Sequence, residues 1–258
     1  ILGAAAVELE LSSDKPLAMV AVRLSDVAPD DKATRVTYGL LNLTHRDSRE
    51  HPEPLVPGET CRVRVKLNYA AQVFPKGHRV RISISTSYWP LAWPSPSPVR
   101  LTVHAGASHV ELPVRKPSAG DAHLRPFDTP EGAAPDPRRP VEPGRHNWLI
   151  HRDLATDRST LEVINDNGKA YLEDIDLEVE NRAFEWYSSW DDDFLSAKGE
   201  TRLIRGLKRD DWAVRTVAHT VLTATETEFR INADLDAFEN GNRVYSRNWN
   251  VAVPRDLV

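Results

Sequence analysis

The sequence predicts an all-β protein, in which a jelly-roll, galactose-binding-like β-sandwich is followed by an antiparallel β meander. Three observations lead to this fold class. Apolar and polar residues alternate with period 2 in many segments, clusters of Pro, Gly, Asn and Asp separate those segments, and no apolar stripe at helical spacing continues beyond about two turns. We expect a sandwich over residues 1–115, a Pro-rich linker or strap over 116–145, and a β-rich C-terminal extension over 146–258.

The first part begins with an alternating pattern around Val7 and continues with further alternating segments. Six of them are clear: residues 19–24, 35–43, 61–67, 79–85, 99–104 and 109–114. In the third of these, Val63 and Val65 share one face of the strand, whereas Arg62 and Arg64 share the other. One side of this sheet should therefore be dry and the other should face water. Several short strands of this kind are typical of a two-sheet sandwich or jelly roll.

Residues 116–145 differ in composition from the segments on either side. Pro117 lies near the start, and Pro135, Pro137 and Pro140 lie near the end. Such a density of proline favours extended backbone without sheet pairing, because proline has no amide hydrogen to donate. We therefore predict a linker or a surface strap between two β-rich parts.

The segments of the last part are longer and follow one another at short intervals. Those that alternate are residues 161–164, 170–180, 183–188, 213–223, 228–238 and 243–253. Asn167-Gly168 and Asn240-Gly241 predict two hairpins, since both residue types tolerate positive φ. Sequential hairpins imply an up-and-down antiparallel meander. The one helix that we predict is a short turn near residues 191–197, where aspartates can cap its N-terminus.

Composition excludes several classes of protein. The chain has 258 residues and a formal net charge of -5, with both signs interspersed, so no basic stripe indicates nucleic acid or anionic lipid. No apolar run approaches the roughly 18 residues of a membrane helix. Because Cys61 is the single cysteine, no disulfide forms within the chain, which favours a cytoplasmic location. The sequence starts at Ile1 without Met, so we expect a piece of a longer polypeptide, and the missing N-terminus leaves the location open.

Motifs that carry chemistry are absent from the sequence. Gly106-Ala107-Ser108-His109 comes nearest to the Gly-x-Ser-x-Gly elbow of serine hydrolases, but it lacks the second Gly and lies between strands. The nine histidines show no spacing with carboxylates that suggests a metal site, and the aspartates at 191–193 lack the Gly and terminal Glu of a calcium loop. We therefore expect no catalytic, cofactor-binding or metal-binding residue, and no cofactor.

Residues 88–98 form the most conspicuous segment, with Tyr88, Trp89, Trp93 and four prolines between two predicted strands. Large aromatic side chains are enriched where proteins pack against neighbours. An active-site rim or a platform for sugar rings are the alternatives. We predict that Tyr88, Trp89 and Trp93 lie at an interface or rim, and that at least one of the two indoles is substantially exposed.

Four segments, taken in order, resemble the C-terminal domain of the X-prolyl dipeptidyl-peptidase and cocaine-esterase family of serine hydrolases. They are residues 23–30 (RLSDVAPD), 39–46 (GLLNLTHR), 52–59 (PEPLVPGE) and 74–85 (FPKGHRVRISIS). The resemblance covers residues 1–115. Residues 209–216 and 254–258 are similar to the tail of longer family members. The resemblance implies an upstream α/β-hydrolase domain that carries the Ser-His-Asp triad, so no catalytic residue is assigned here.

The resemblance implies a function for the chain as a whole. We expect the non-catalytic C-terminal domain of an acyl esterase or X-Pro dipeptidyl-peptidase-like enzyme, which supports the catalytic domain and contributes to the active-site rim or to an oligomer. Its expected partners are the upstream catalytic domain and a second copy of the chain. A stand-alone carbohydrate- or peptide-binding β-sandwich module is the alternative from another class. The substrate of the parent enzyme is not encoded in these residues.

Overall fold

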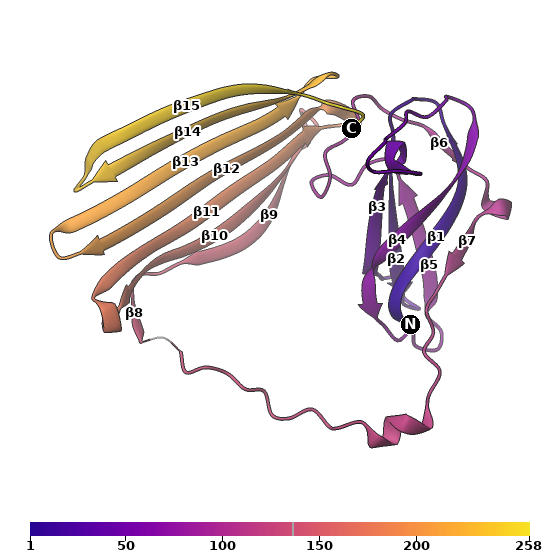
Figure 1. The fold of residues 1–258 in the computed structure, drawn as a ribbon, viewed down its shortest axis with the longest axis horizontal. Helices are drawn as coiled ribbons and strands as arrows, with labels where there is room; N and C mark the ends of the chain where they lie inside the picture. The colour runs from indigo at the N-terminus through magenta and orange to yellow at the C-terminus, as the bar shows by residue number, and fades with distance from the viewer. Residues whose placement is uncertain (136) are drawn as a thin grey trace. The chain divides into compact units, whose positions relative to one another are not determined.

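The computed structural model describes residues 1–135 and 137–258, which form two compact units (Figure 1). Unit 1 comprises residues 1–129 together with Leu257 and Val258, and unit 2 comprises residues 130–256. In the described residues the helical segments are 3-10 turns of three to five residues. The all-β prediction is confirmed. None of these helical segments has the length and apolar character that a membrane crossing requires.

Unit 1 is built from two antiparallel sheets. The first has the order β4-β1-β6, and β7 also pairs with β1; its strands are β1 (Leu2–Ser13), β4 (Thr60–Ala71), β6 (Leu101–Val103) and β7 (His109–Glu111). The second has the order β3-β2-β5, with strands β2 (Met19–Val27), β3 (Ala33–Asn42) and β5 (Arg79–Ser85).

Apolar side chains of both sheets meet in one core. Leu9 of β1 and Val65 of β4 belong to the same buried cluster as Val22 and Leu24 of β2, and each of them is at most 2% exposed. Burying one such side chain stabilises the folded state by about 1.5–3 kcal/mol. The period-2 alternation therefore identifies the inner face of each sheet, and the outer faces carry the polar residues.

The end of the chain belongs to unit 1. The carbonyl oxygen of Leu257 accepts hydrogen bonds from Asn42 Nδ2, at 2.8 Å, and from Thr44 Oγ1, at 3.0 Å. Asn42 and Thr44 flank the start of the 3-10 turn Leu43–His45, so the chain end helps to satisfy the polar groups of that turn.

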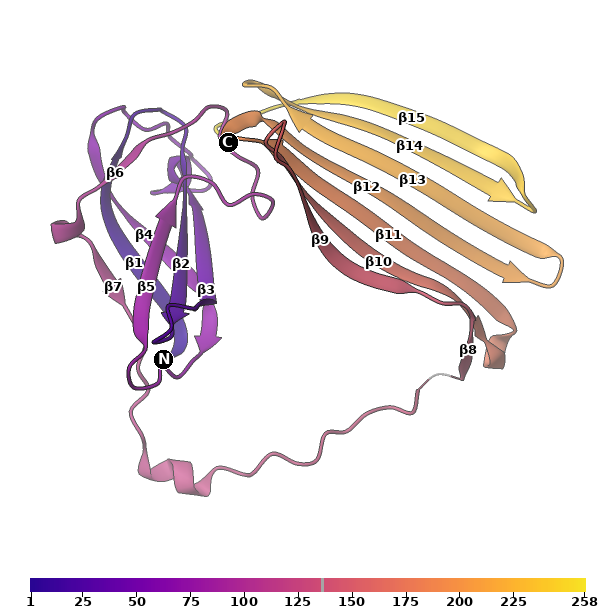
Figure 2. The same ribbon diagram turned by 180° about the vertical axis from the view of Figure 1, so that it is seen from behind.

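Unit 2 is one antiparallel sheet with the order β15-β14-β13-β12-β11-β10-β8, in which β9 also pairs with β10. Figure 2 shows its long strands side by side in sequence order. The strands are β8 (Arg138–Glu142), β9 (Arg145–Asp153), β10 (Arg158–Leu172), β11 (Leu177–Trp190), β12 (Asp193–Arg209), β13 (Trp212–Ala224), β14 (Glu228–Glu239) and β15 (Asn242–Pro254). The predicted antiparallel meander is confirmed.

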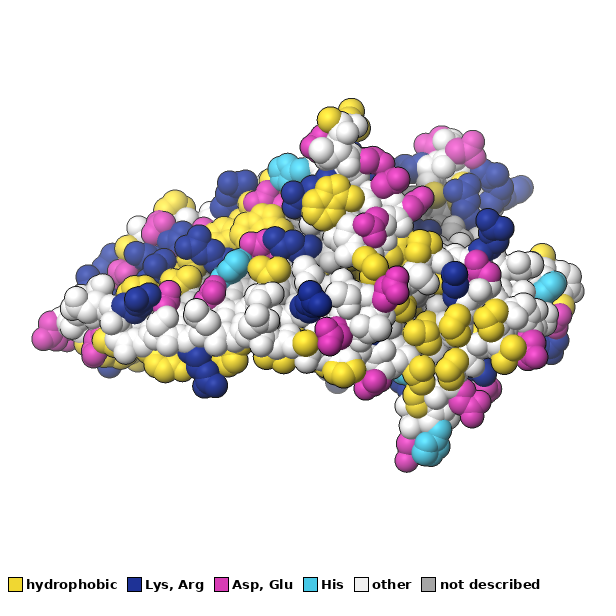
Figure 3. Space-filling view, turned by 90° about the horizontal axis from the view of Figure 1, so that it is seen from above, with side chains coloured by type: hydrophobic (Ala, Val, Ile, Leu, Met, Phe, Trp, Pro, Cys, Tyr) yellow, Lys and Arg dark blue, Asp and Glu magenta, His cyan; other side chains and the backbone are white. Residues whose placement is uncertain are grey.

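The two faces of the sheet in unit 2 differ in character. Direct strand pairing places Trp148 beside Val163 on one face, and Ile150 beside Leu161 on the same face. The side chains of Trp148 and Ile150 are 71% and 79% exposed. The other face carries charged residues, among them Glu162, Glu200 and Arg202. Figure 3 shows that acidic and basic side chains are interspersed with apolar ones over the surface of the chain that this view presents.

One of the two predicted hairpins is wrong. Asn167-Gly168 does not end a strand, because β10 continues through it with a bulge between Asp166 and Lys169. Gly168 has φ +62°, and a Cβ there would lie 2.1 Å from the carbonyl oxygen of Glu142. Glycine is therefore needed for a close backbone approach inside the sheet rather than for a turn. The turn between β10 and β11 instead uses Asp176, with φ 50°.

The second Asn-Gly pair does form a hairpin. Asn240 has φ 49° and Gly241 has φ 81°, and together they connect β14 to β15. Positive φ at both central residues is the geometry of the two-residue turn whose twist matches that of the flanking strands.

Two further expectations need correction. Residues 191–197 form no helix: Asp191 has φ 41°, and β12 begins at Asp193, whose carboxylate accepts a hydrogen bond from the backbone of Leu195 at 2.9 Å. The predicted linker is shorter than 116–145, because Arg138–Glu142 form β8. Pro140 is tolerated there because β8 is an edge strand. Asp136, also in the predicted linker, lies outside the described residues.

Candidate functional site

Tyr88 lies in the loop after β5 and is anchored to the outer face of the second sheet of unit 1. Its ring packs edge-on against Tyr38, with centroids 5.5 Å apart and planes at 84°. Its hydroxyl accepts a hydrogen bond from Arg35 Nη1 at 2.5 Å, and the guanidinium of Arg23 lies over its ring, 5.3 Å from the centroid. Tyr88 is therefore held between β2 and β3 by one hydrogen bond and two ring contacts.

Trp89 and Trp93 pack against each other in the same loop. Their ring centroids are 4.9 Å apart and their planes meet at 82°, the edge-to-face arrangement that aromatic pairs prefer. Both side chains are half-buried, which is less exposure than the sequence analysis expects for at least one of them. The assignment of Tyr88, Trp89 and Trp93 to an interface or an active-site rim stays a prediction.

The segments that carry the family resemblance form structural contacts. His78 Nδ1 lies 2.8 Å from Asp26 Oδ1, and Gln72 Nε2 donates to the same carboxylate at 3.4 Å. Gly77, with φ 88°, turns the chain just before His78. These contacts fix the start of β5 to the end of β2.

Gly39, in another of these segments, marks a close approach between the two sheets. A Cβ at this position of β3 would lie 2.5 Å from the backbone carbonyl oxygen of Lys66 in β4. Every other residue type would push the two strands apart, since real Cβ atoms do not approach backbone oxygen that closely.

Ser108 has a structural hydrogen-bond pattern. Its Oγ accepts a hydrogen bond from the backbone amide of Glu10, at 3.1 Å, and donates to the backbone carbonyl of His104, at 2.9 Å. Among the described residues, no imidazole is hydrogen-bonded to this hydroxyl. The two hydrogen bonds of Ser108 hold the 3-10 turn Ala105–Ala107 to β1.

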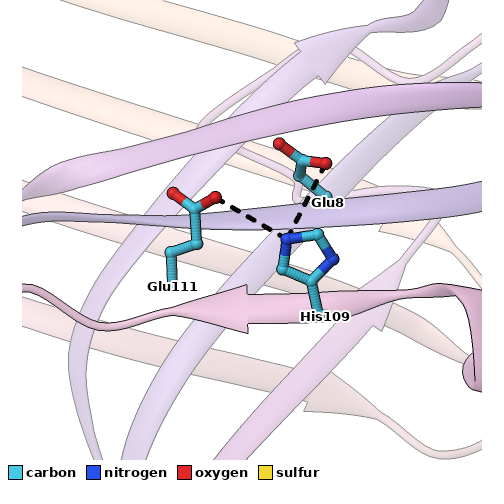
Figure 4. A group of neighbouring side chains, drawn as sticks. All are labelled: Glu8, His109 and Glu111. Carbon is cyan, nitrogen blue, oxygen red and sulfur yellow. Dashed lines mark ion pairs between the residues drawn. The ribbon is translucent and has the colours of Figure 1, made fainter.

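Glu8, His109 and Glu111 come together on the outer face of the first sheet of unit 1 (Figure 4). His109 Nε2 lies 3.8 Å from Glu8 Oε2 and 3.6 Å from Glu111 Oε1. His109 was not singled out in the sequence analysis, yet its side chain lies beside two carboxylates, and the absence of a metal site stays a prediction. His109 and Glu111 are two residues apart on β7, a signal that the sequence contains, but Glu8 joins them only through the pairing of β1 with β7.

Arg64 already occupies the carboxylates of this cluster. Its Nη1 donates to Glu8 Oε1 at 2.6 Å and to Glu111 Oε1 at 2.9 Å, and its Nη2 donates to Glu111 Oε2. Hydrogen bonds from Arg64 hold the pKa of Glu111 below its usual range. A divalent cation would have to displace a guanidinium that neutralises both acids. We therefore interpret the cluster as a cross-strand ion-pair network.

Comparison with known proteins identifies a family for unit 1. Residues 1–125 match the X-Pro dipeptidyl-peptidase C-terminal non-catalytic domain. Cocaine esterase from Rhodococcus sp. (strain MB1 Bresler) is 27% identical over 90 residues, which are 35% of this chain and 16% of the esterase. The resemblance inferred from the four segments is confirmed. The chain thus matches only a small part of this relative's length, and the similarity of residues 209–216 and 254–258 to longer members stays a prediction.

Two solved structures also resemble part of the chain. An aminopeptidase from the marine sediment archaeon Thaumarchaeota archaeon has 22% identity and a TM-score of 0.36, over 37% of this chain and 17% of its own. A selenomethionine-labelled α-amino acid ester hydrolase has 24% identity and a TM-score of 0.41, over 44% of this chain and 24% of its own.

Proposed function

We propose, from the membership of residues 1–125 in the family of X-Pro dipeptidyl-peptidase C-terminal non-catalytic domains, that this chain supports the catalytic domain of an α/β-hydrolase-type serine hydrolase. The parent enzyme would be an acyl esterase or an X-Pro dipeptidyl-peptidase-like enzyme. The family match is the observation that carries this proposal. The match covers only 16% of the length of cocaine esterase, so the presence of a catalytic domain in the parent protein is itself part of the proposal.

The contacts of residues in the matched segments support a structural role for unit 1. Asp26, Gly39 and His78 contribute to strand pairing and to the close packing of the two sheets. Ser108, in the segment nearest to a nucleophile motif, is engaged with backbone groups. A domain whose characteristic residues fix a sandwich is suited to present a rigid surface to a neighbouring domain.

We assign Tyr88, Trp89 and Trp93 to the contact with the catalytic domain or to the rim of its active site. The tight anchoring of Tyr88 by Arg35 and Tyr38 supports this assignment, because a preorganised aromatic loop loses little conformational entropy on docking. The alternative is that this loop forms the contact between two copies of the chain in a homo-oligomer. On the evidence of a single cysteine, we also place the parent enzyme in the cytoplasm.

A stand-alone carbohydrate- or peptide-binding module is not favoured by the family match. The geometry of the loop agrees, because the edge of one indole covers the face of the other in the Trp89–Trp93 pair. A sugar platform needs an open aromatic face. A glycan array with the wild-type chain and with Trp93→Ala should therefore show equal, background signals.

The first test is for turnover by the chain alone. The purified chain should not hydrolyse p-nitrophenyl acetate or Ala-Pro-p-nitroanilide faster than a heat-denatured sample. Hydrolysis that disappears on Ser108→Ala would show that the chain is itself an enzyme and would overturn the proposal.

The second test concerns the support of a catalytic domain. In the natural polypeptide that contains this chain, deletion of residues 1–258 should lower the melting temperature of the hydrolase domain and its recovery in soluble form. The double variant Trp89→Ala, Trp93→Ala should also lower the melting temperature of the hydrolase domain, but by less than the deletion does. A polypeptide without an α/β-hydrolase domain, or a deletion without effect on hydrolase stability and turnover, would contradict the proposal.

A further inference from the structure

Three arginines gather on the outer face of the second sheet of unit 1. Ser25 of β2 lies directly between Arg35 of β3 and Arg81 of β5. Two residues earlier on β2, Arg23 lies between Tyr38 and Ser83. Directly opposed residues of antiparallel strands point to the same side, so the three guanidinium groups surround the small side chains of two serines.

A pocket of about 380 Å³ lies among these side chains. We call it the arginine pocket, and its polar lining consists of Arg23, Arg35, Arg81, Ser25, Ser83 and Tyr88. This lining contains hydroxyl and guanidinium groups and no carboxylate. All of its residues belong to unit 1.

None of the three arginines has an acidic partner in the part of the chain that the structure describes. Among the described residues, Arg23, Arg35 and Arg81 form no ion pair with a carboxylate, and the Nε of Arg23 is buried with no hydrogen-bond partner there. Two acids of the same region are engaged by other residues, Asp26 by His78 and Asp31 by Arg79. The pocket therefore concentrates positive charge that no described carboxylate neutralises.

Most of the other eight arginines of unit 1 are ion-paired, with Arg49 and Arg100 as the exceptions among the described residues. Six of them form ion pairs: Arg46, Arg62, Arg64, Arg79, Arg115 and Arg125. Like charges held close together repel each other, and an anion between them removes that repulsion. A guanidinium donates two parallel hydrogen bonds to a carboxylate or phosphate, and serine hydroxyls add further donors.

The pocket is also held in place before any ligand arrives. Arg35 donates to the hydroxyl of Tyr88, Arg23 lies over the ring of Tyr88, and Arg35 itself lies 5.0 Å from the centroid of Tyr38. Long arginine side chains otherwise lose much rotamer freedom on binding, so these ring contacts lower the entropic cost of capturing an anion.

We propose that the arginine pocket binds an oxyanion, a carboxylate or a phosphate, between the guanidinium groups of Arg35 and Arg81. The oxyanion is either a free ion or an acidic side chain on a protein surface, and both present the same chemistry to the pocket. The proposal does not depend on the function proposed above, because it concerns unit 1 alone and involves no hydrolysis.

The test is a titration of the 15N-labelled chain followed by amide and arginine Nε–H resonances at constant ionic strength. One arm uses inorganic phosphate, and the other uses a terminally blocked peptide with two aspartates. We expect saturable shifts confined to the pocket, at Arg23, Ser25, Arg35, Arg81 and Ser83. Saturation in both arms identifies a site for free oxyanions, and saturation with the peptide alone identifies a site for side-chain carboxylates.

Variants separate the pocket from general charge. Arg81→Gln should weaken binding by about tenfold or more, because it removes a bidentate charge-assisted contact. Arg81→Lys keeps the charge but not the fork and should weaken it by less. Arg62→Gln removes the same charge from the outer face of the other sheet, where Arg62 pairs with Glu10, and should leave binding unchanged. No saturable shift in either arm, or an equal loss in Arg62→Gln, would overturn the proposal.

Discussion

Unit 1 and unit 2 bury their side chains in different ways, although both consist of antiparallel strands with the same alternation. In unit 1 two sheets enclose an apolar core in which Leu9 and Leu24 are at most 2% exposed. In unit 2 a single sheet buries charged groups alongside a few apolar ones: Asp166 is 9% and Glu180 7% exposed, beside Ile164 at 4%. Alternation therefore predicts strands, but it does not show whether a face is covered by a second layer or by its own ion pairs.

The ion pairs of unit 2 form a connected group on one face of the sheet. Arg182 bonds to Asp166 at 3.0 Å and to Glu180 at 2.8 Å, and Arg215 bonds to Glu180 at 2.9 Å. Burial acts to raise the pKa of Glu180, but the hydrogen bonds from Arg215 and Arg182 outweigh it and hold that pKa below its usual range. Glu180 is therefore nearly as buried as a core side chain of unit 1, but ion pairs rather than apolar contacts hold it in place.

The largest effect is expected in the core of unit 1. Leu24→Ala should lower the free energy of unfolding by about 2–5 kcal/mol, because it leaves a cavity between the two sheets. Urea denaturation measures the change, and hydrogen exchange should place it in unit 1. Leu91→Ala, at a side chain that is 50% exposed, is the matched control and should cost far less. Equal losses would show that unit 1 has no such core.

A smaller effect is expected at the bulge in β10. Gly168→Ala should destabilise unit 2 by about 2–3 kcal/mol, because positive φ is combined with a clash against Glu142. Gly241→Ala also has positive φ, but nothing lies within 4 Å of its new Cβ, so we expect about 1 kcal/mol there. Thermal unfolding of both variants isolates the clash. The account of the bulge fails if the two substitutions cost the same.

Removal of the buried charge in unit 2 should have a comparable or smaller effect. At pH 7, Glu180→Gln should lower the free energy of unfolding by about 1–3 kcal/mol, because Arg182 and Arg215 lose a charged acceptor. Glu178→Gln, on the same face and without an ion pair among the described residues, is the control.

The same variant predicts a pH dependence. Since the pKa of Glu180 is lower in the folded than in the unfolded state, its contribution is complete above the unfolded value of about 4.3 and is lost as pH falls through the folded value. The difference between wild type and Glu180→Gln should therefore shrink from pH 7 toward pH 3. A difference that grows on acidification would contradict the assigned direction.

The smallest effect is expected on the outer face of unit 1. Glu8→Gln removes one partner of Arg64, but Glu111 stays hydrogen-bonded to it, and the pair is exposed. We expect a loss of less than about 1 kcal/mol that declines further in high salt. Denaturation at low and high ionic strength checks this. A large loss that is independent of salt would mean that the network is part of the core.

Local features of the fold could be predicted from the sequence where one residue type determines the backbone. Asn240-Gly241 forms the predicted hairpin because both residues adopt positive φ. Asn167-Gly168 has the same two residue types but lies in a bulge of β10. The backbone of Glu142 lies against Gly168 there, and that contact depends on strand pairing that the local sequence does not reveal. Strand β8 was not predicted because it contains Pro140, and a proline in an edge strand gives the same sequence pattern as a proline in a linker.

Sites that depend on strand pairing could not be found in the same way. Alternation places Arg81 and Ser83 on one face of β5, but their proximity to Arg23 and Arg35 follows only from the sheet order β3-β2-β5. Likewise, the position of Glu8 next to His109 follows from the register between β1 and β7. Family resemblance located unit 1 but assigned no binding residue within it.

The most direct test of the contrast between the two units is hydroxyl-radical footprinting of the chain, read residue by residue by mass spectrometry. Trp148 and Ile150 of unit 2, which are 71% and 79% exposed, should be modified rapidly, whereas Leu9 and Leu24 of unit 1 should be almost unmodified. Indole reacts intrinsically faster than an aliphatic side chain, so Ile150 against Leu24 is the decisive pair. Equal protection of Ile150 and Leu24 would show that the apolar face of unit 2 is covered, and would contradict the account of a single-layer sheet.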